Sequence, residues 1–206
     1  VDASSGERRT SGSAASLAGI EAALESGDPA RIQRAVDRLL CGYAMVFGFG
    51  GIPLLYMGDE IGLFNDHSFL DSAEKAADNR WIHRPAMDWQ TAEDAAAGRL
   101  GHSIAGQIFM RIRQLASARR RLESLHASLN TRVRSATEQG VAIFERNHPA
   151  GHLIQVYNLA NAERWVGTHE LGDLHGRVVD ELTQMSFELN DGLTLAPYEV
   201  RWLRRG

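Results

Sequence analysis

The sequence predicts an α+β fold in two parts, and three patterns lead to this prediction. Apolar residues recur at helical spacing in residues 29–47 and 103–122. Between these segments, residues 52–57 form a short apolar run bounded by turn residues, which indicates a strand buried on both faces. After residue 128, apolar and polar residues alternate, as is typical of antiparallel strands. Helix, strand, long loop and helix in this order are typical of the last β/α units of a TIM (β/α)8 barrel, and the alternating region predicts a C-terminal antiparallel β-sandwich.

The helical segments begin and end at residues with suitable local chemistry. A short helix is predicted over residues 14–24, and Gly27 ends it. Asp28 is a good N-cap and Pro29 suits the first helical position, so the second helix should begin there. Gly48 and Gly50 should end that helix.

The alternating region predicts five strands separated by clusters of turn residues. Asp191 followed by Gly192 between two such runs is a hairpin signal. The expected strands cover residues 141–146, 153–158, 163–168, 177–182 and 193–203.

Two domains are therefore expected. Residues 1–125 would form the C-terminal part of the barrel, and residues 126–206 would form the β-sandwich, with the boundary near residues 124–137. The chain opens at Val1 on a polar stretch with no preceding strand, which leads us to expect the C-terminal piece of a longer polypeptide.

Composition and charge exclude several classes of partner. The 206 residues carry a formal net charge of −4 and no dominant basic run, so nucleic acid and anionic membranes are poor candidates. No apolar stretch is long enough to span a bilayer, and the first residues show no signal-peptide pattern. Cys41 is the single cysteine, which excludes an internal disulfide and fits a reducing, cytoplasmic compartment, with secretion left open.

The long loop over residues 61–101 contains most of the residues that could take part in binding or catalysis. Loops of this length usually serve a function or contain short elements of their own. Histidines and carboxylates in this loop could in principle bind a metal, but no pair has a recognised ligand spacing, so a polar cleft wall is favoured. Just before the loop, Asp59 and Glu60 follow the predicted strand, where functional groups of α/β folds are found.

Five segments together resemble one enzyme family. Residues 51–60 (GIPLLYMGDE) resemble the segment that runs into the eighth barrel strand and its loop in the α-amylase superfamily of retaining glycosidases. Residues 78–85 (DNRWIHRP) resemble the corresponding loop of amylosucrases and sucrose hydrolases. Residues 9–17, 105–108 and 193–203 are similar to the same enzymes, in the same order.

This resemblance implies an activity as well as a fold. The parent enzyme would transfer glucose from sucrose to an α-glucan or to water through a covalent glucosyl intermediate, with no catalytic metal or other cofactor. Retaining glycosidases need two carboxyl groups about 5 Å apart, and neighbouring residues such as Asp59 and Glu60 point to opposite sides of an extended segment. In the resembled family the catalytic Asp, Glu and Asp lie on earlier strands. No counterpart occurs here, so no catalytic residue is assigned and this chain alone should be inactive.

Two arginines are carried over from the family as substrate-binding candidates. Arg80 matches an arginine that closes the base of the glucose pocket by pairing with an aspartate, which would lie outside this chain. Arg9 matches an arginine on the acceptor side of the cleft. The alternatives are an ion pair within the loop for Arg80 and a solvated loop residue for Arg9. Trp81, Trp89 and Trp202 could stack on sugars, although packing is the simpler interpretation. His67 and His83 could bind sugar hydroxyls, although a surface role is simpler.

A different class of protein stays open as the alternative. The predicted β-sandwich could be a carbohydrate-binding or interaction module without catalysis. The helical block over residues 14–122 argues against this, because a free-standing sandwich needs no such block.

Overall fold

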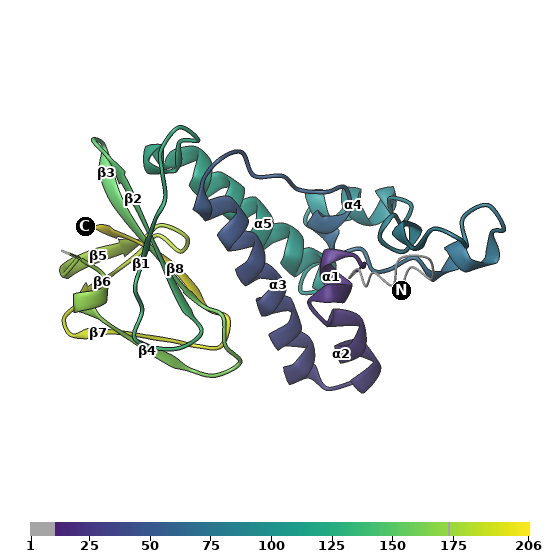
Figure 1. Cartoon of the computed structure of the whole chain (residues 1–206), viewed down its shortest axis with the longest axis horizontal. Coiled ribbons are helices and arrows are strands. Elements are labelled where there is room, and N and C mark those ends of the chain that lie inside the picture. The colour runs from purple at the N-terminus through teal and green to yellow at the C-terminus, as the bar shows by residue number, and fades with distance from the viewer. Residues whose placement is uncertain (1–10, 173) are drawn as a thin grey trace. The chain divides into compact units, whose positions relative to one another are not determined.

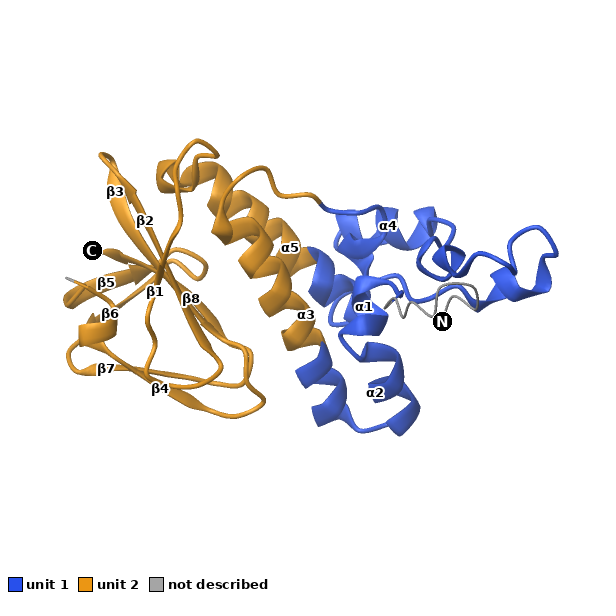
Figure 2. Ribbon diagram, in the orientation of Figure 1, with its two compact units in different colours: residues 1–35, 55–109 blue, residues 36–54, 110–206 orange. Residues whose placement is uncertain are grey.

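The computed structural model describes residues 11–172 and 174–206, which divide into two compact units (Figure 2). Unit 1 comprises Val1–Ala35 and Leu55–Phe109, and unit 2 comprises Val36–Leu54 and Met110–Gly206. The chain passes between the units inside helix α3 (Pro29–Phe49), at residues 54–55 and inside helix α5 (Ile104–Arg121). The domain boundary expected near residues 124–137 stays a prediction.

The first predicted helix is two short helices, α1 (Ala14–Leu17) and α2 (Ile20–Ser26). Gly19 separates them because its backbone adopts a left-handed conformation with φ of 87°, which a glycine reaches without steric cost. The predicted start of α3 is confirmed, since the Asp28 carboxylate accepts a hydrogen bond of 2.9 Å from the Ala30 N–H.

The buried strand predicted over residues 52–57 is wrong in this structure. These residues form no strand, and Ile52 and Leu54 are 88% and 82% exposed. A central parallel strand needs a neighbour on each side to pair its N–H and C=O groups. All the strand pairs in the described part of the chain are antiparallel, so none offers this segment a parallel neighbour. The barrel units are therefore not confirmed.

The long loop contains short elements of its own, as expected. Three 3-10 helices and one α-helix interrupt it, and each of the last three has an aspartate that accepts a backbone N–H at its start. The elements are Asp59–Ile61, His67–Asp71, Asn79–His83 and α4 (Trp89–Ala96).

Unit 2 contains two antiparallel sheets, which confirms the antiparallel character predicted from the alternation (Figure 1). A six-stranded sheet has the order β1-β2-β3-β8-β5-β6, and β4 and β7 form a two-stranded sheet. The strands are β1 (Arg132–Arg134), β2 (Val141–His148), β3 (Gly151–Asn158), β4 (Arg164–Gly167), β5 (Gly176–Asp180), β6 (Met185–Leu189), β7 (Gly192–Leu195) and β8 (Val200–Arg205).

The structure corrects the strand prediction in two ways. The predicted strand over residues 193–203 is divided into β7 and β8, because Pro197 has no N–H to donate and Tyr198 has a left-handed φ of 59°. Strands β1 and β6 were not predicted. Both are short, with three and five residues, so any alternation of apolar and polar residues in them is too brief to stand out as a strand pattern.

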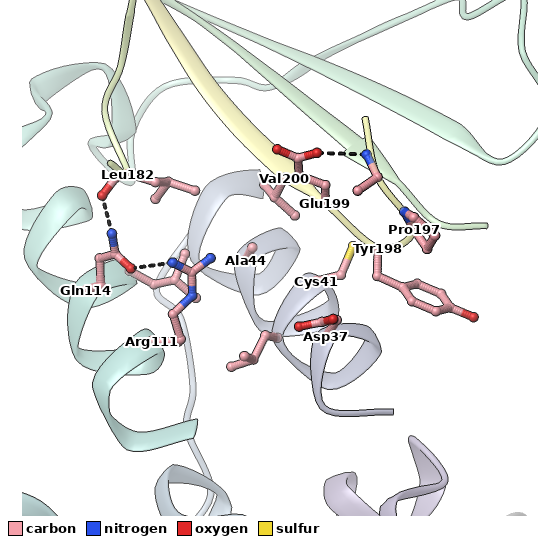
Figure 3. Close-up of a pocket in the computed structure, with 13 residues that line it drawn as sticks. Asp37, Cys41, Ala44, Arg111, Gln114, Leu182, Pro197, Tyr198, Glu199 and Val200 are labelled. Atoms are coloured by element: carbon pink, nitrogen blue, oxygen red, sulfur yellow. Dashed lines mark hydrogen bonds between the residues drawn. The ribbon is translucent and has the colours of Figure 1, made fainter. Parts of the chain in front are cut away.

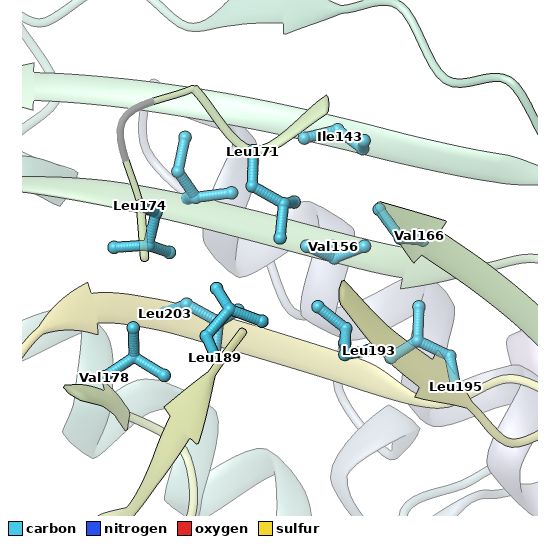
Figure 4. Packing of buried hydrophobic residues seen from close by; sticks show 11 residues of the cluster. Ile143, Val156, Val166, Leu171, Leu174, Val178, Leu189, Leu193, Leu195 and Leu203 are labelled. Carbon is cyan, nitrogen blue, oxygen red and sulfur yellow. The ribbon is translucent and has the colours of Figure 1, made fainter. Parts of the chain in front are cut away.

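Apolar side chains from both sheets form one core (Figure 4). Ile154 and Val156 of β3 point into this core, whereas the intervening Gln155 and the following Tyr157 belong to the other face of the sheet. The cluster contains Ile143, Ile154, Val156, Val166, Leu171, Leu174, Val178, Leu189, Leu193, Leu195 and Leu203.

Helix α3 packs on the second face of the six-stranded sheet through its residues in unit 2. The Tyr157 hydroxyl donates a hydrogen bond of 3.3 Å to the Ala44 carbonyl. Gly48 makes this close approach possible, since a Cβ there would overlap the Tyr157 hydroxyl. Phe49 meets Phe144 edge to face, with 5.2 Å between the ring centroids.

Arg146 joins three parts of unit 2 through a fully buried guanidinium group. Its Nη1 donates to the Phe49 carbonyl at 3.0 Å, at the end of α3. The same group donates to Leu129 O and Thr131 Oγ1, while Nε and Nη2 donate to Ser124 O and His126 O, at 2.7–3.0 Å. One cation thus satisfies carbonyl groups of a helix end and of the connection that leads into the sheet.

Candidate functional site

A glycine-bounded turn begins the region that the sequence indicated as a cleft wall. Gly58 has a φ of 94°, and the Glu60 carboxylate accepts a hydrogen bond of 2.8 Å from the Gly58 N–H. A Cβ at Gly58 would overlap the Leu63 side chain, so both the backbone angle and the space require glycine. Glu60 therefore stabilises the turn.

Three hydrogen bonds join segments of unit 1 that lie far apart in the sequence. The Asn65 amide oxygen accepts from the Ser13 N–H at 2.8 Å, and the Asn65 N–H donates to the Ser16 hydroxyl at 3.0 Å. The Asp66 N–H donates to the Ile82 carbonyl at 2.8 Å. Residues 12–16, the turn at residue 58 and the loop near residue 83 therefore lie together.

These segments enclose a hollow of about 150 Å³. Asp59 and His83 both line it, so the structure brings together two residues that the sequence had singled out separately. The full lining is Gly12, Ser13, Ala14, Tyr56, Met57, Asp59, Leu63, His83 and Pro85. A small hollow with an aromatic residue, a carboxylate and an imidazole can hold part of a polar ligand.

The hollow does not contain the acid pair of a retaining glycosidase. Asp59 supplies the carboxyl group among its lining residues, and the neighbouring Glu60 turns back to Gly58. Retention needs a nucleophile and an acid/base on opposite sides of the bond, about 5 Å apart. This hollow can therefore bind or orient a sugar but cannot cleave a glycosidic bond by itself.

Arg80 lies outside this hollow and pairs with a carboxylate of its own loop. Its Nε and Nη2 atoms donate to the two Asp78 oxygens, each at 2.8 Å, and the Arg80 side chain is 64% exposed. The structure thus places Arg80 in the local ion pair that was the alternative to a pocket role. The bidentate contact with the guanidinium, together with the Arg80 N–H, lowers the pKa of Asp78 to about 2.

The other candidate residues lie apart from the hollow or outside the described residues. Arg9 belongs to residues 1–10, which the structure does not describe. Trp81 has two cations near its ring, Lys75 Nζ at 4.6 Å and Arg84 Cζ at 5.6 Å from the centroid. Trp89 is 65% exposed at the start of α4.

The described residues show three further features that bear on other kinds of site. No group of three histidine, cysteine, aspartate or glutamate side chains in residues 11–172 and 174–206 is placed to hold a metal ion. Cys41 is buried, and desolvation raises the pKa of its thiol to about 12. In the same part of the chain, no helix is both long and apolar enough to cross a membrane.

Sequence reasoning missed part of the hollow and the whole of a second cavity. Tyr56 and Met57 line the hollow, although the pattern had assigned them to a buried strand. Asp37 and Arg111 line a cavity in unit 2 and were not among the candidate residues. No sequence signal identifies them, because their cavity forms only when the helices meet the residues before β8.

The two C-terminal sheets match a known family of domains. A family model described as "Amylosucrase, C-terminal domain" matches residues 131–204. That segment begins just before β1 and ends in β8.

One curated relative is glucosylglycerate phosphorylase from Escherichia coli (strain K12). It is 24% identical over 182 residues, which cover 87% of this chain and 30% of the relative. The chain thus spans about a third of that enzyme's length.

Two solved structures share the fold. Eubacterium rectale Amy13B is similar with a TM-score of 0.58 and 17% identity, over 96% of this chain and 38% of its own. AmyP, solved with maltose, is similar with a TM-score of 0.59 and 18% identity, over 85% and 35%. These matches support a relationship to the glycoside hydrolases of family 13, which include α-amylases, and to the C-terminal domains of those enzymes.

Proposed function

We propose that this chain is the C-terminal portion of a retaining α-glucosylase that acts on sucrose. In the first step a carboxylate of the parent enzyme would attack the anomeric carbon of glucose while fructose leaves with a proton from a second carboxyl group. In the second step an α-glucan hydroxyl or water would replace the first carboxylate at the anomeric carbon and give its proton to the second carboxylate. Both carboxyl groups would come from residues outside this chain.

One observation carries the proposal that further polypeptide completes the fold. Ile52 and Leu54 are almost fully exposed, although they belong to an apolar run that leads directly into the turn at Gly58. Exposed apolar runs of this kind mark surfaces that another element covers. Parallel strands of the parent on both sides of residues 52–57 would bury this run and bring the hollow beside Asp59 to the carboxyl ends of the strands.

The proposal of sucrose as the substrate starts from the amylosucrase-like segments of the sequence, and residues 131–204 match the amylosucrase C-terminal domain. In the parent enzyme Arg80 would exchange its exposed partner Asp78 for an aspartate at the base of the glucose pocket. Arg9 would lie on the acceptor side. An α-glucan acceptor agrees with AmyP, which was solved with maltose.

A second candidate is phosphorolysis, in which phosphate replaces water or glucan as the acceptor. The phosphorylase relative favours this chemistry, because its similarity extends over 87% of this chain. Glucose would then leave as glucose 1-phosphate. A third candidate, the non-catalytic carbohydrate-binding module, would need no carboxylates at all.

The first test compares the isolated 206-residue chain with the full-length parent. Each is incubated with sucrose, with and without inorganic phosphate, and free fructose, free glucose and glucose 1-phosphate are measured. The chain alone should release none of these products. Fructose release by the parent supports action on sucrose, and glucose 1-phosphate would favour the phosphorylase. If neither protein releases a product, the sucrose proposal is wrong.

The second test addresses Arg80 in the full-length parent. Arg80→Ala should weaken sucrose binding, because a carboxylate at the pocket base loses its bidentate partner, and Arg80→Lys should rescue only part of the loss. Arg99→Ala is the matched control, since Arg99 forms a comparable exposed pair with Asp94 at 2.5 Å. Unchanged kcat and KM in a folded Arg80→Ala enzyme would make Arg80 an ordinary loop residue.

A further inference from the structure

Unit 2 contains a cavity of about 210 Å³ that the proposed catalysis does not use (Figure 3). Its walls are the part of α3 after residue 36, the part of α5 after residue 110 and the turn over residues 196–200. A cavity for a drug-sized ligand usually has about 300–1,000 Å³, so this one suits a single ring of hexose size.

The cavity combines an apolar floor with a polar rim. Leu40, Ala44 and Leu115 are nearly completely buried and form part of the floor. The rim has both hydrogen-bond donors and acceptors: Arg111 donates, Gln114 can donate and accept, and the carboxylates of Asp37 and Glu199 accept.

Hydrogen bonds hold several rim groups in place. Arg111 Nη1 donates to the Gln114 side-chain oxygen at 2.9 Å, and the Gln114 amide donates to the Leu182 carbonyl (Figure 3). Glu199 accepts from the Ala196 N–H at 2.7 Å and pairs with Arg201 at 2.5 Å. The rim is therefore arranged before any ligand arrives, which lowers the entropic cost of binding.

The geometry points to a binding site for one ring of a neutral sugar, separate from the hollow beside Asp59. A sugar hydroxyl both donates and accepts, so it can bond to Arg111 or Gln114 on one side and to Asp37 or Glu199 on the other. The C–H groups of the ring would lie on the apolar floor. The two carboxylates disfavour an anion, and the polar rim disfavours a purely apolar ligand.

This inference stands independently of the proposed function. It needs no catalytic carboxylate and no substrate in the unit 1 hollow. A non-catalytic carbohydrate-binding protein could use the same cavity, and the parent of a glucosylase could use it to hold a glucan away from the site of cleavage.

The test is maltose titration of the 206-residue chain, followed by amide chemical shifts in NMR spectra. We expect saturable shifts at residues 196–200 and in the Gln114 side-chain amide. Arg111→Ala should weaken maltose binding about tenfold, since a hydrogen bond from a charged donor is lost. Arg113→Ala is the matched control, because Arg113 is an exposed arginine on the same helix that does not line the cavity.

Three results would overturn the inference. The first is the absence of saturable shifts in residues 196–200. The second is competition by inorganic phosphate at the same residues, which would indicate an anion site. The third is a response confined to Tyr56 and Leu63, which would assign maltose to the unit 1 hollow and so support the proposed function while refuting this site.

Discussion

The loop of unit 1 and the sheets of unit 2 are stabilised by interactions of different range. In the loop, Asp66, Asp78 and Asp88 each bond to a backbone N–H two or three residues further on. In unit 2, Arg146 reaches residues that lie 15 to 97 positions away in the sequence. Asp180 is fully buried and bonds to Arg201 at 3.1 Å and to the Trp202 N–H at 3.2 Å.

This difference indicates which contacts contribute most to the stability of the fold. Local pairs on an exposed loop contribute little, because water competes for the same groups. Buried long-range contacts contribute more and fail together when one partner is removed. The buried contacts of the sheets should therefore contribute more to the free energy of unfolding than the local pairs of the loop.

Removing the Arg146 side chain should have the largest effect on stability. Arg146→Ala leaves five oxygen acceptors without their donor. We expect the free energy of unfolding to fall by about 3–5 kcal/mol, the usual loss when one member of a buried charged network is removed. Urea titration measures this change.

Arg132→Ala provides the control for Arg146, because its side chain is 73% exposed and its nearest carboxylate oxygen lies 3.8 Å away. Its effect should stay within about 0.5 kcal/mol. Equal effects of the two substitutions would contradict the importance that we give to the buried guanidinium.

Truncation in the sheet core should have the next largest effect. Leu203→Ala creates a cavity in the fully buried cluster and should cost about 3 kcal/mol in the free energy of unfolding. Leu70→Ala in the unit 1 loop should cost less than about 0.5 kcal/mol, because Leu70 is 59% exposed. A large loss from Leu70→Ala in thermal or urea unfolding would remove the contrast between the two regions.

Alanine substitution should change the stability of the protein in opposite directions at two glycines of α3. Gly48→Ala should destabilise the protein by about 1–3 kcal/mol, because the new Cβ overlaps the Tyr157 hydroxyl and lies 2.8 Å from Gln155 Nε2. Gly42→Ala should stabilise it by up to about 1 kcal/mol through helix propensity, since nothing lies within 4 Å of the new Cβ. Melting curves of both variants are the measurement, and stabilisation by Gly48→Ala would show that α3 does not pack closely on the sheet.

Loss of the ion pair between Asp78 and Arg80 in the loop should have the smallest effect on stability. The pKa of Asp78 is about 2, below the ordinary value of about 3.9, so the pair contributes stability above about pH 4 that is lost as the pH falls toward 2. Arg80→Gln should return the pKa of Asp78 toward its ordinary value. An NMR titration of the Asp78 carboxyl group measures this, and an unchanged pKa would show that the pair does not form in solution.

Local signals in the sequence predicted much of the secondary structure. Asp28 followed by Pro29 marked the start of α3, and alternation marked β2 and β3 correctly, because capping and side-chain alternation depend on neighbouring residues. The break at Gly19 was missed, since an isolated glycine can also lie within a helix. The carboxylates and histidines of the loop were noticed, but which of them lie together was not predictable.

The sequence by itself determined the antiparallel region, the two long helices and the positions of the chemically interesting loop. Only the tertiary structure decided that Arg80 pairs with Asp78, that Asp59 and His83 share a hollow, and that Arg146 bonds to carbonyl groups up to 97 positions away. The exposed run over residues 52–57 shows the physical reason. Its apolar pattern is local, but a strand exists only where a neighbouring strand supplies hydrogen bonds, and that condition is set by residues far away in the chain or beyond it.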